Sequence, residues 1–301
     1  MTTFLLGVDA GGSRTRAALL DTAGTLLGRG ESDGANPAGP DPDATVATLA
    51  AAVSAALGPR DPARDPARVA ACLIGLAGYR ALPDPDGFAR RVRTALGLHC
   101  PVRLVPDTVP ALASGGVTDG RGTVLIAGTG TICVRLDGDR TLARSGGLGW
   151  LLGDEGGGFW LGREALRHAH AGPDSPLGSA VRAHCAADSP DRLLRWAYAG
   201  PPRRLADLAP VVTRLATAGD TAALAIARTA AEHLAALVRA TATTTEPLVL
   251  TGSVATSPGP IRDHLLRHLA DLTPQLPTTD AATAAALLAG RRAGRIARRT
   301  P

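Results

Sequence analysis

The sequence contains no lysine: all 32 basic residues among its 301 residues are arginine. A P-loop NTPase places a lysine on the β- and γ-phosphates of its nucleotide, and a protein kinase uses a lysine on a strand of its N-terminal lobe. Both classes are therefore excluded. If this protein handles ATP, then backbone amides, hydroxyl groups and a carboxylate-bound Mg²⁺ must hold the phosphates.

Aromatic residues are also scarce, at 3% of the chain, although 45% of the residues are hydrophobic. This composition is sufficient for one large domain or two lobes with cores of Leu, Val, Ile and Ala. The net charge is +5, and arginines cluster only in the segment 291–299. Because no aromatic residues that could stack on bases accompany them, we interpret this segment as a solvated helix and expect no nucleic-acid partner.

Cysteine is limited to four residues, Cys72, Cys100, Cys133 and Cys185, which are far apart and form no CxxC pair. Cys72 and Cys133 lie in apolar runs, which predicts buried thiols. The chain passes from Met1 directly into a strand-like run, without a basic leader or a long apolar stretch. We therefore expect no membrane segment, and a cytoplasmic protein with reduced thiols.

One order of elements occurs twice along the chain: short strands joined by tight turns, followed by helices. Glycine turns and short apolar runs predict these strands, and Ala-rich segments after Pro or polar entries predict the helices. The predicted strands are 4–9, 15–21, 26–32, 69–76, 102–106, 123–127, 132–137, 141–145 and 248–251. The predicted helices are 43–57, 86–96, 108–114, 160–171, 177–187, 191–199, 205–216, 221–241, 261–269 and 281–292. We expect an α/β fold of two lobes, 1–116 and 117–280.

The first glycine turn follows a short apolar run and reads Asp-Ala-Gly-Gly-Ser-Arg-Thr from Asp9 to Thr15. Gly11 and Gly12 would take positive φ angles and let the backbone approach a phosphate, and successive turn amides form an anion-binding concavity. Ser13 offers a hydroxyl, and Asp9 at the strand end is suited to hold Mg²⁺ through water. Taken alone, such a turn would favour an ordinary hairpin with a polar turn.

The second glycine turn shifts that balance towards phosphate binding. Gly128-Thr129-Gly130-Thr131 again combines glycines with hydroxyl side chains in a turn. Thr129 is suited to bind a phosphate, and Thr131 is suited to contact an acceptor substrate. Between the two turns, Asp107 closes a predicted strand and precedes a predicted helix. A helix N-cap is the simplest role for such an aspartate. Its place between two phosphate turns makes it our candidate general base.

A third block, residues 146–160, surrounds an acidic pair with glycines, and we predict an irregular binding loop there. Asp154 and Glu155 are suited to bidentate hydrogen bonds with vicinal hydroxyls, and Asn36 could add an amide contact. A turn before Pro37 is the plain alternative for Asn36. Further along the chain, Gly252 and Ser253 end a predicted strand, where a glycine would let a purine lie against the backbone.

These residues together resemble the N-acetylglucosamine kinases within the BadF/BadG/BcrA/BcrD ATPase family of the actin–hexokinase–Hsp70 superfamily. The most specific part is the segment 147–163, which reads GLGWLLGDEGGGFWLGR where the family usually has GWGxLLGDEGSGxWIGR. The two glycine turns, Asn36, Asp107 and the 252–254 segment follow in the expected order. The resemblance runs almost end to end.

The resemblance implies two RNase-H-like lobes with a central cleft, and a C-terminal helix, 281–301, that packs back on the first lobe. ATP phosphates would lie at residues 11–15 and 128–131, with adenine near 252–254 and Mg²⁺ at Asp9. Asp107 would take the proton from the 6-hydroxyl of the sugar as it attacks the γ-phosphate. The sugar-binding residues implied are Asn36, Asp107, Thr131, Gly146, Gly147, Asp154 and Glu155.

The main hypothesis is therefore an ATP-dependent kinase for N-acetylglucosamine, and departures from the family pattern leave glucosamine open as the substrate. Leu148 stands where the family often has Trp, Gly157 replaces a common Ser, and Ile132 follows Thr131 where animal members tend to have Asn. An ATPase that activates a partner reductase is a second alternative, but its bridging iron–sulfur cluster needs paired cysteines. A sugar sensor is a third. Dimers are common in such kinases, so a homodimer is compatible, although no interface signature is present.

Overall fold

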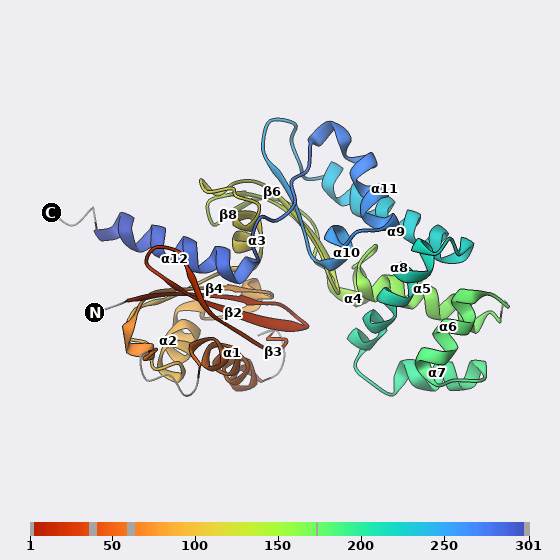
Figure 1. The fold of residues 1–301 in the computed structure, drawn as a ribbon, viewed down its shortest axis with the longest axis horizontal. Coiled ribbons are helices and arrows are strands. Elements are labelled where there is room, and N and C mark those ends of the chain that lie inside the picture. Colours follow the sequence, from red (N-terminus) through yellow and green to blue (C-terminus); the bar gives the residue numbers. More distant parts are fainter. Residues whose placement is uncertain (1–2, 36–40, 59–63, 173, 298–301) are drawn as a thin grey trace. The chain divides into compact units, whose positions relative to one another are not determined.

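The computed structural model describes residues 3–35, 41–58, 64–172 and 174–297. The chain divides into two compact units: unit 1 comprises Met1–Gly120 and Pro277–Pro301, and unit 2 comprises Arg121–Leu276. The sequence places the corresponding boundaries at 116 and 280. Each unit contains one sheet with helices, as the α/β prediction requires (Figure 1).

Unit 1 is built on a five-stranded sheet in the order β3-β2-β1-β4-β5. The strands are β1 (Phe4–Ala10), β2 (Arg14–Asp21), β3 (Leu26–Asp33), β4 (Val69–Leu76) and β5 (Val102–Pro106). The first three form an antiparallel meander, and β4 and β5 extend it in parallel with β1. The parallel strands therefore end at the same edge of the sheet, which is where Asp9 and Asp107 occur.

Helices cover both faces of this sheet. They are α1 (Pro42–Leu57), α2 (Pro85–Ala95), α3 (Thr108–Ser114) and α12 (Ala281–Ala297). Alternation along β1 directs Leu6 and Val8 into one core with residues of α1 and α2, while α12 packs on the other face (Figure 1). On that second face, a Cβ at Gly7 would lie 2.1 Å from the carbonyl oxygen of Ala282. Glycine at this position therefore lets α12 lie directly on β1.

Unit 2 is built on a four-stranded sheet in the order β8-β7-β6-β9. The strands are β6 (Arg121–Ala127), β7 (Thr131–Asp137), β8 (Arg140–Gly146) and β9 (Leu248–Thr251). The first three strands in sequence are antiparallel neighbours, and β9 pairs in parallel with β6. Strand β8 is thus an edge strand, and it leads directly into the glycine-rich block.

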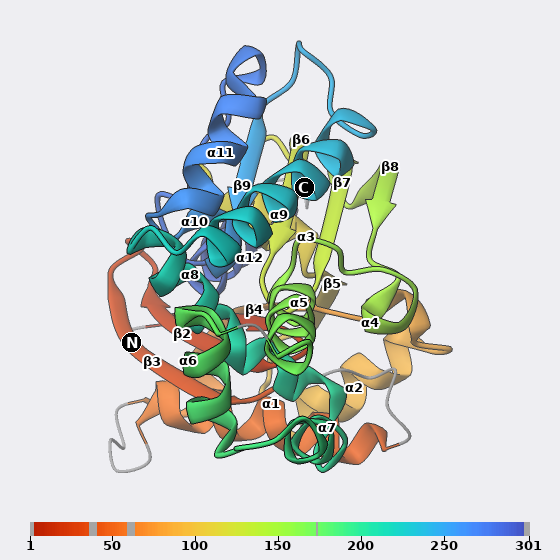
Figure 2. The ribbon, with the colours of Figure 1, turned by 90° about the vertical axis from the view of Figure 1, so that its right-hand side faces the viewer.

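In unit 2, the long helix α9 (Thr221–Arg239) packs against α5, α8 and α11, while α6 and α7 pack against α5 (Figure 2). The others are α4 (Gly149–Leu152), α5 (Gly158–His170), α6 (Pro176–Cys185), α7 (Pro190–Tyr198), α8 (Ala209–Thr217), α10 (Ser253–Thr256) and α11 (Pro260–His268). By length and composition α9 could cross a membrane. Ala227, Ala231 and Leu234 of α9, however, lie fully buried in the core of unit 2, as is usual for the central helix of a globular domain.

The structure corrects the sequence prediction in two helical regions. The predicted helix 205–216 is divided into a 3₁₀ segment, Pro202–Leu208, and α8. Pro210 explains the break, because it has no N–H to donate within a continuing helix but is well accommodated in a first turn. The sequence predicts an irregular block at 146–160, but this block contains the short helix α4.

Candidate active site

Asp9 lies near the end of β1, within a small group of charged residues on the α12 face of the sheet. Register places Arg16 of β2 directly opposite it on one side and Gly75 of β4 on the other. Burial raises the pKa of Asp9 to about 7, the negative charge of Asp107 adds to this, and Arg16 opposes it. Asp280, which precedes α12, raises the pKa of Asp9 further. The structure thus brings the candidate metal ligand and the candidate base together.

Asp107 follows β5 and occupies the N-cap position of α3, but its side chain makes no capping hydrogen bond to that helix. The N-cap position is therefore confirmed for Asp107, but without the capping hydrogen bond from its side chain. Burial raises the pKa of Asp107 to about 6, although the residue keeps part of its surface accessible. A Cβ at Gly75 would lie 2.4 Å from Pro110 Cγ, so glycine there allows α3 to begin against β4. A partly accessible carboxylate of raised pKa is well suited to accept a proton.

The first glycine turn is held by two backbone hydrogen bonds. The amide of Gly11 donates to the carbonyl of Arg14 at 2.9 Å, and the amide of Ala35 donates to the carbonyl of Gly11 at 3.0 Å. The expected positive φ is wrong for Gly11 and Gly12, and also for Gly128 and Gly130. At Gly12, however, a Cβ would meet no atom within 4 Å, so the backbone is open to a ligand.

Thr15, assigned to the nucleotide from the sequence, is fully buried. It pairs with Ala10, so it lies on the sheet face opposite to Asp9. Its hydroxyl finds no hydrogen-bond partner among the described residues. The structure therefore places this side chain in the interior beneath the turn, whereas Ser13 is exposed at the turn itself.

In unit 2, the turn Gly128–Thr131 is bound to the first turn of α5. The amide of Gly158 donates to the carbonyl of Gly128 at 2.8 Å, and the amide of Phe159 donates to the carbonyl of Thr129 at 2.9 Å. A Cβ at Gly128 would meet no atom within 4 Å. The two blocks found separately in the sequence therefore form one continuous structure with an open backbone position.

Asp154 connects these two blocks through its side chain. Its Oδ1 accepts a hydrogen bond from the amide of Thr131 at 2.9 Å, and the hydroxyl of Thr131 donates to the carbonyl of Glu155 at 3.3 Å. Burial raises the pKa of Asp154 and the Thr131 amide opposes that rise. A Cβ at Gly130 would lie 2.5 Å from Asp154 Oδ1, so only glycine allows this close contact.

The other residues assigned from the sequence are two glycines at the end of β8, the Gly252–Ser253 pair and Asn36. Gly146 and Gly147 are adjacent left-handed residues at the end of β8, with φ of 72° and 67°. Gly252 has φ of 83°, and a Cβ there would lie 2.3 Å from the carbonyl oxygen of Ala127. Close packing against β6 is thus a sufficient reason for Gly252, independent of a purine, while Ser253 next to it is exposed. Asn36 lies outside the described residues.

The fit of Mg²⁺ to these residues depends on charge. No group of three His, Cys, Asp or Glu side chains that could hold a metal occurs in the described part of the chain. Mg²⁺ is usually held by one or two protein carboxylates together with waters and substrate phosphates, so a single aspartate is a sufficient protein ligand. Burial and then the negative charge of Asp107 raise the pKa of Asp9, and a divalent cation would oppose both effects by favouring the ionised carboxylate. The donor set therefore fits the ion.

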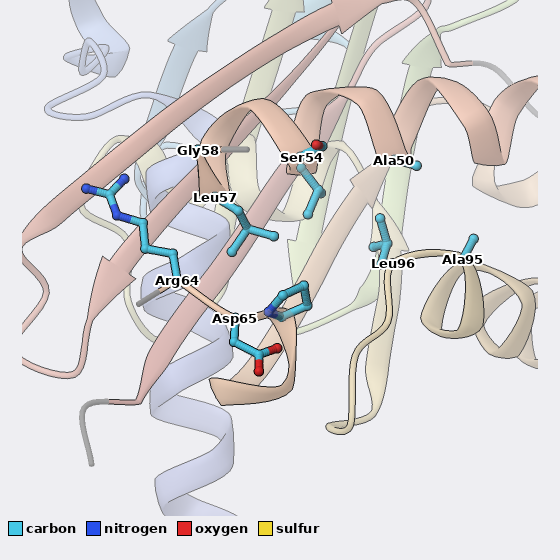
Figure 3. A pocket seen from close by; sticks show the side chains of 10 residues that line it. Ala50, Ser54, Leu57, Gly58, Arg64, Asp65, Ala95 and Leu96 are labelled. Carbon is cyan, nitrogen blue, oxygen red and sulfur yellow. The ribbon is translucent and has the colours of Figure 1, made fainter. Parts of the chain in front are cut away.

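A cavity of about 510 Å³ lies elsewhere in unit 1, between α1 and the segments near residues 64–66 and 95–96 (Figure 3). Its lining consists of Ala50, Val53, Ser54, Leu57, Gly58, Arg64, Asp65, Pro66, Ala95 and Leu96. None of these residues is assigned to nucleotide or sugar. The cavity is bordered by α1, which covers the sheet face opposite to α12, so it is separate from the Asp9 group.

Two residues near Asp9 were missed by the sequence reasoning: Arg16 and Asp280. Strand alternation would have identified Arg16, since it lies on the Asp9 face of the same hairpin. Asp280 accepts a hydrogen bond from the amide of Thr283 at 2.8 Å and forms an ion pair with Arg29 at 2.6 Å. No local signal shows that a residue so distant in sequence approaches Asp9.

Comparison with known proteins identifies relatives over almost the whole chain. The profile of the BadF/BadG/BcrA/BcrD ATPase family matches residues 6–289. The N-acetyl-D-glucosamine kinase of Dictyostelium discoideum is 27% identical over 310 residues, covering 94% of this chain and 97% of that protein. The crystal structure of a candidate N-acetylglucosamine kinase from Chromobacterium violaceum is 29% identical, with a TM-score of 0.74, and the match covers 95% of this chain and 98% of that one.

A more distant structure supports the fold alone. A ROK family glucokinase from Streptomyces griseus, solved with glucose and AMPPNP, is 18% identical with a TM-score of 0.60, and the match covers 95% of this chain and 98% of that one. The expected α/β fold of the actin-like ATPases is thereby confirmed.

Proposed function

Because the chain belongs to the BadF/BadG/BcrA/BcrD ATPase family, we propose that it is an ATP-dependent kinase that phosphorylates N-acetylglucosamine on its 6-hydroxyl. The observation that carries the proposal is the position of Asp107 and Asp9 at one edge of the unit 1 sheet, where the charge of Asp107 raises the pKa of Asp9. Asp107 is partly accessible, has a pKa raised to about 6, and makes no capping hydrogen bond through its side chain. These are the properties required of a base that removes the hydroxyl proton near neutral pH.

In unit 1, the proposed division of labour follows from the neighbours of Asp107. Asp9 would hold Mg²⁺, which supplies neutralising charge for the phosphates when it is bound. In the turn at Gly11, Gly12 and Ser13, the amides of Gly12 and Ser13 and the Ser13 hydroxyl would donate hydrogen bonds to phosphate oxygens, while the Gly11 amide closes the turn on Arg14. Phosphoryl transfer depends mainly on positioning and charge stabilisation, so it can proceed without a lysine.

In unit 2, we assign further phosphate contacts to Gly128, Thr129 and Gly130. The sugar is assigned to Thr131, to three residues hydrogen-bonded to it, and to Gly146, which precedes the last of them; the three are Asp154, Glu155 and Gly147. Support comes from the hydrogen bonds that join these segments, since a rigid turn keeps its donors aligned without a further ordering cost. We assign adenine to the neighbourhood of Gly252 and Ser253.

Glucosamine is an alternative acceptor, because Leu148, Gly157 and Ile132 depart from the family pattern in the region assigned to the sugar. The alternative of an ATPase that activates a reductase is disfavoured by the cysteines. All four are buried, and burial raises the pKa of Cys133 to about 12 and of Cys185 to about 11. Buried, protonated thiols are poorly placed to hold a bridging cluster.

The proposal also takes the protein to be cytoplasmic. It would act on a small molecule, without a membrane or nucleic-acid partner.

The test is a panel of hexosamines, with ADP release measured and the product identified by NMR. N-acetylglucosamine with Mg·ATP should give the 6-phosphate, and glucosamine should be the closest competitor. Faster turnover of glucosamine would transfer the assignment to that sugar. Absence of sugar-stimulated ADP release across the panel would refute a sugar kinase.

A further inference from the structure

We propose that Arg144 is a positioning residue that fixes the Gly146–Gly147 turn for sugar binding; this inference depends on the proposed function. Arg144 lies on the edge strand β8, and its guanidinium donates to two carbonyls of the chain just ahead. Nε donates to the carbonyl of Gly146 at 3.0 Å, and Nη2 donates to the carbonyl of Gly147 at 2.5 Å. The side chain thus closes back over the turn that follows its own strand.

The turn needs such a restraint because of its backbone. Two adjacent glycines have many accessible conformations, and both are here left-handed, at φ of 72° and 67°. A Cβ at Gly147 would lie 2.7 Å from Ile132 Cδ1 and 3.0 Å from Arg144 Nη2. Ile132 and Arg144 therefore enclose this residue from two sides, and no larger residue could replace it without displacing one of them.

The turn is also connected to the centre of the unit 2 site. The amide of Gly147 donates to the carbonyl of Thr131 at 2.8 Å, and the amide of Thr131 donates to Asp154 Oδ1 at 2.9 Å. A single line of contacts therefore runs from Arg144 through the turn to Thr131 and Asp154. These are the residues to which the sugar is assigned, whereas the carbonyls of Gly128 and Thr129 in the phosphate turn accept hydrogen bonds from the amides of Gly158 and Phe159.

Because the two turns have different hydrogen-bond partners, loss of the Arg144 contacts should weaken sugar binding more than nucleotide binding. The guanidinium can hold both carbonyls at once because its donors lie in a fixed planar fork, which a lysine ammonium lacks. Loss of the fork would release the turn and weaken sugar binding. It would leave Asp107, Asp9 and the phosphate turn in place, so catalysis by bound substrate would continue.

The experiment compares R144M, R144K and a control, R140A, by steady-state kinetics and thermal melting. Methionine keeps most of the side-chain length and removes all donors. Arg140 is exposed on the same strand. We expect R144M to raise the KM for sugar about tenfold, as for loss of a charge-assisted hydrogen bond, with kcat and the KM for ATP within about twofold of wild type. R144K should recover part of the loss, and R140A should match wild type.

Two results would overturn the role of Arg144 while leaving the kinase intact. One is a wild-type sugar KM in R144M. The other is a parallel loss of kcat, ATP affinity and melting temperature in R144M, which would indicate a structural role. Absence of hexosamine phosphorylation by the wild-type protein would instead refute the proposed function, and the Arg144 inference with it.

Discussion

Asp154 Oδ1 accepts a hydrogen bond from the backbone amide of Thr131 at 2.9 Å, across an interval of 23 residues. Asp154 has φ of 64°, a left-handed conformation that is uncommon for a residue other than glycine. A strained residue of this kind is retained only where the surroundings determine its conformation. The relationship therefore gives Asp154 a second role beside the proposed sugar contact, which is to fix the position of Thr131.

Two substitutions of Asp154 should separate these roles. Asp154→Ala leaves the Thr131 amide without its acceptor, which should cost about 1–3 kcal/mol of unfolding free energy. Asp154→Asn keeps an acceptor oxygen at the same place and should lose much less stability, while still weakening the sugar if the charge contributes to binding. Thermal melting and sugar KM of the two variants provide the comparison. Equal melting temperatures for both would contradict the proposed hydrogen-bonding role.

The open backbone positions at Gly12 and Gly128 make a prediction about nucleotide binding. A methyl group at either position meets no atom within 4 Å, and neither residue has a positive φ. Gly12→Ala and Gly128→Ala should therefore fold with nearly unchanged melting temperatures. Both should bind ADP more weakly, by about tenfold or more, if phosphate approaches the backbone there.

Calorimetric titration with ADP and with adenosine is the measurement for these glycine variants. Adenosine carries no phosphate, so its affinity should be unaffected. Gly294→Ala is the matched control, because Gly294 lies on α12, outside the site, and a Cβ there also meets no atom within 4 Å. This control should bind ADP as the wild type does. Unchanged ADP affinity in both turn variants would mean that the two turns do not hold phosphate.

The raised pKa of Asp9 predicts how the ligand-free protein responds to pH. A folded-state pKa of about 7 against an ordinary value of 3.8 means that folding favours the protonated form. The associated stabilisation is complete below about pH 4 and is lost as pH rises through about 7. Asp9→Asn removes this loss, so the variant should gain melting temperature relative to wild type at pH 8 and much less at pH 5. Both proteins would be melted in EDTA without nucleotide. A difference independent of pH would show that Asp9 does not titrate in this range.

Close packing at Gly7 predicts a large effect on stability without any role in chemistry. Its substitution by alanine would place a methyl group 2.1 Å from the carbonyl oxygen of Ala282, which is backbone and cannot rotate away. Gly7→Ala should therefore destabilise unit 1 by about 1–3 kcal/mol or more, as for an overpacked core. Chemical denaturation measures this value. A variant as stable as the wild type would contradict the close packing of α12 on β1.

The strands of both units were predictable from the sequence because each is a short apolar run between turn-forming residues. The predicted strands 69–76, 102–106 and 248–251 coincide with β4, β5 and β9, and the others differ by one or two residues at an end. The helix 205–216 was not predictable, since the interruption depends on Pro210 acting within an otherwise continuous apolar pattern. The two glycine turns and the acidic block were identified, but their mutual hydrogen bonding was not, because backbone contacts between distant segments leave no periodicity in the sequence.

The structural role of each glycine was also difficult to predict from the sequence. The sequence suggests positive φ at Gly11, Gly12, Gly128 and Gly130, whereas Gly130 makes room for the Asp154 carboxylate and Gly12 and Gly128 leave open space. Asp280 illustrates the same limit. Its approach to Asp9 arises from the packing of α12 on β1, which is a tertiary relationship that no local pattern encodes.

The central claim, that Asp107 is the general base, is tested most directly by the kcat of Asp107→Asn with N-acetylglucosamine and Mg·ATP. Asp86→Asn is the matched control, since Asp86 is an acidic residue in the first turn of α2 with no place in the site. The account predicts a fall in kcat of about 10²–10⁴-fold for Asp107→Asn, with ADP affinity retained and Asp86→Asn unchanged. Turnover at the wild-type rate in Asp107→Asn would contradict it.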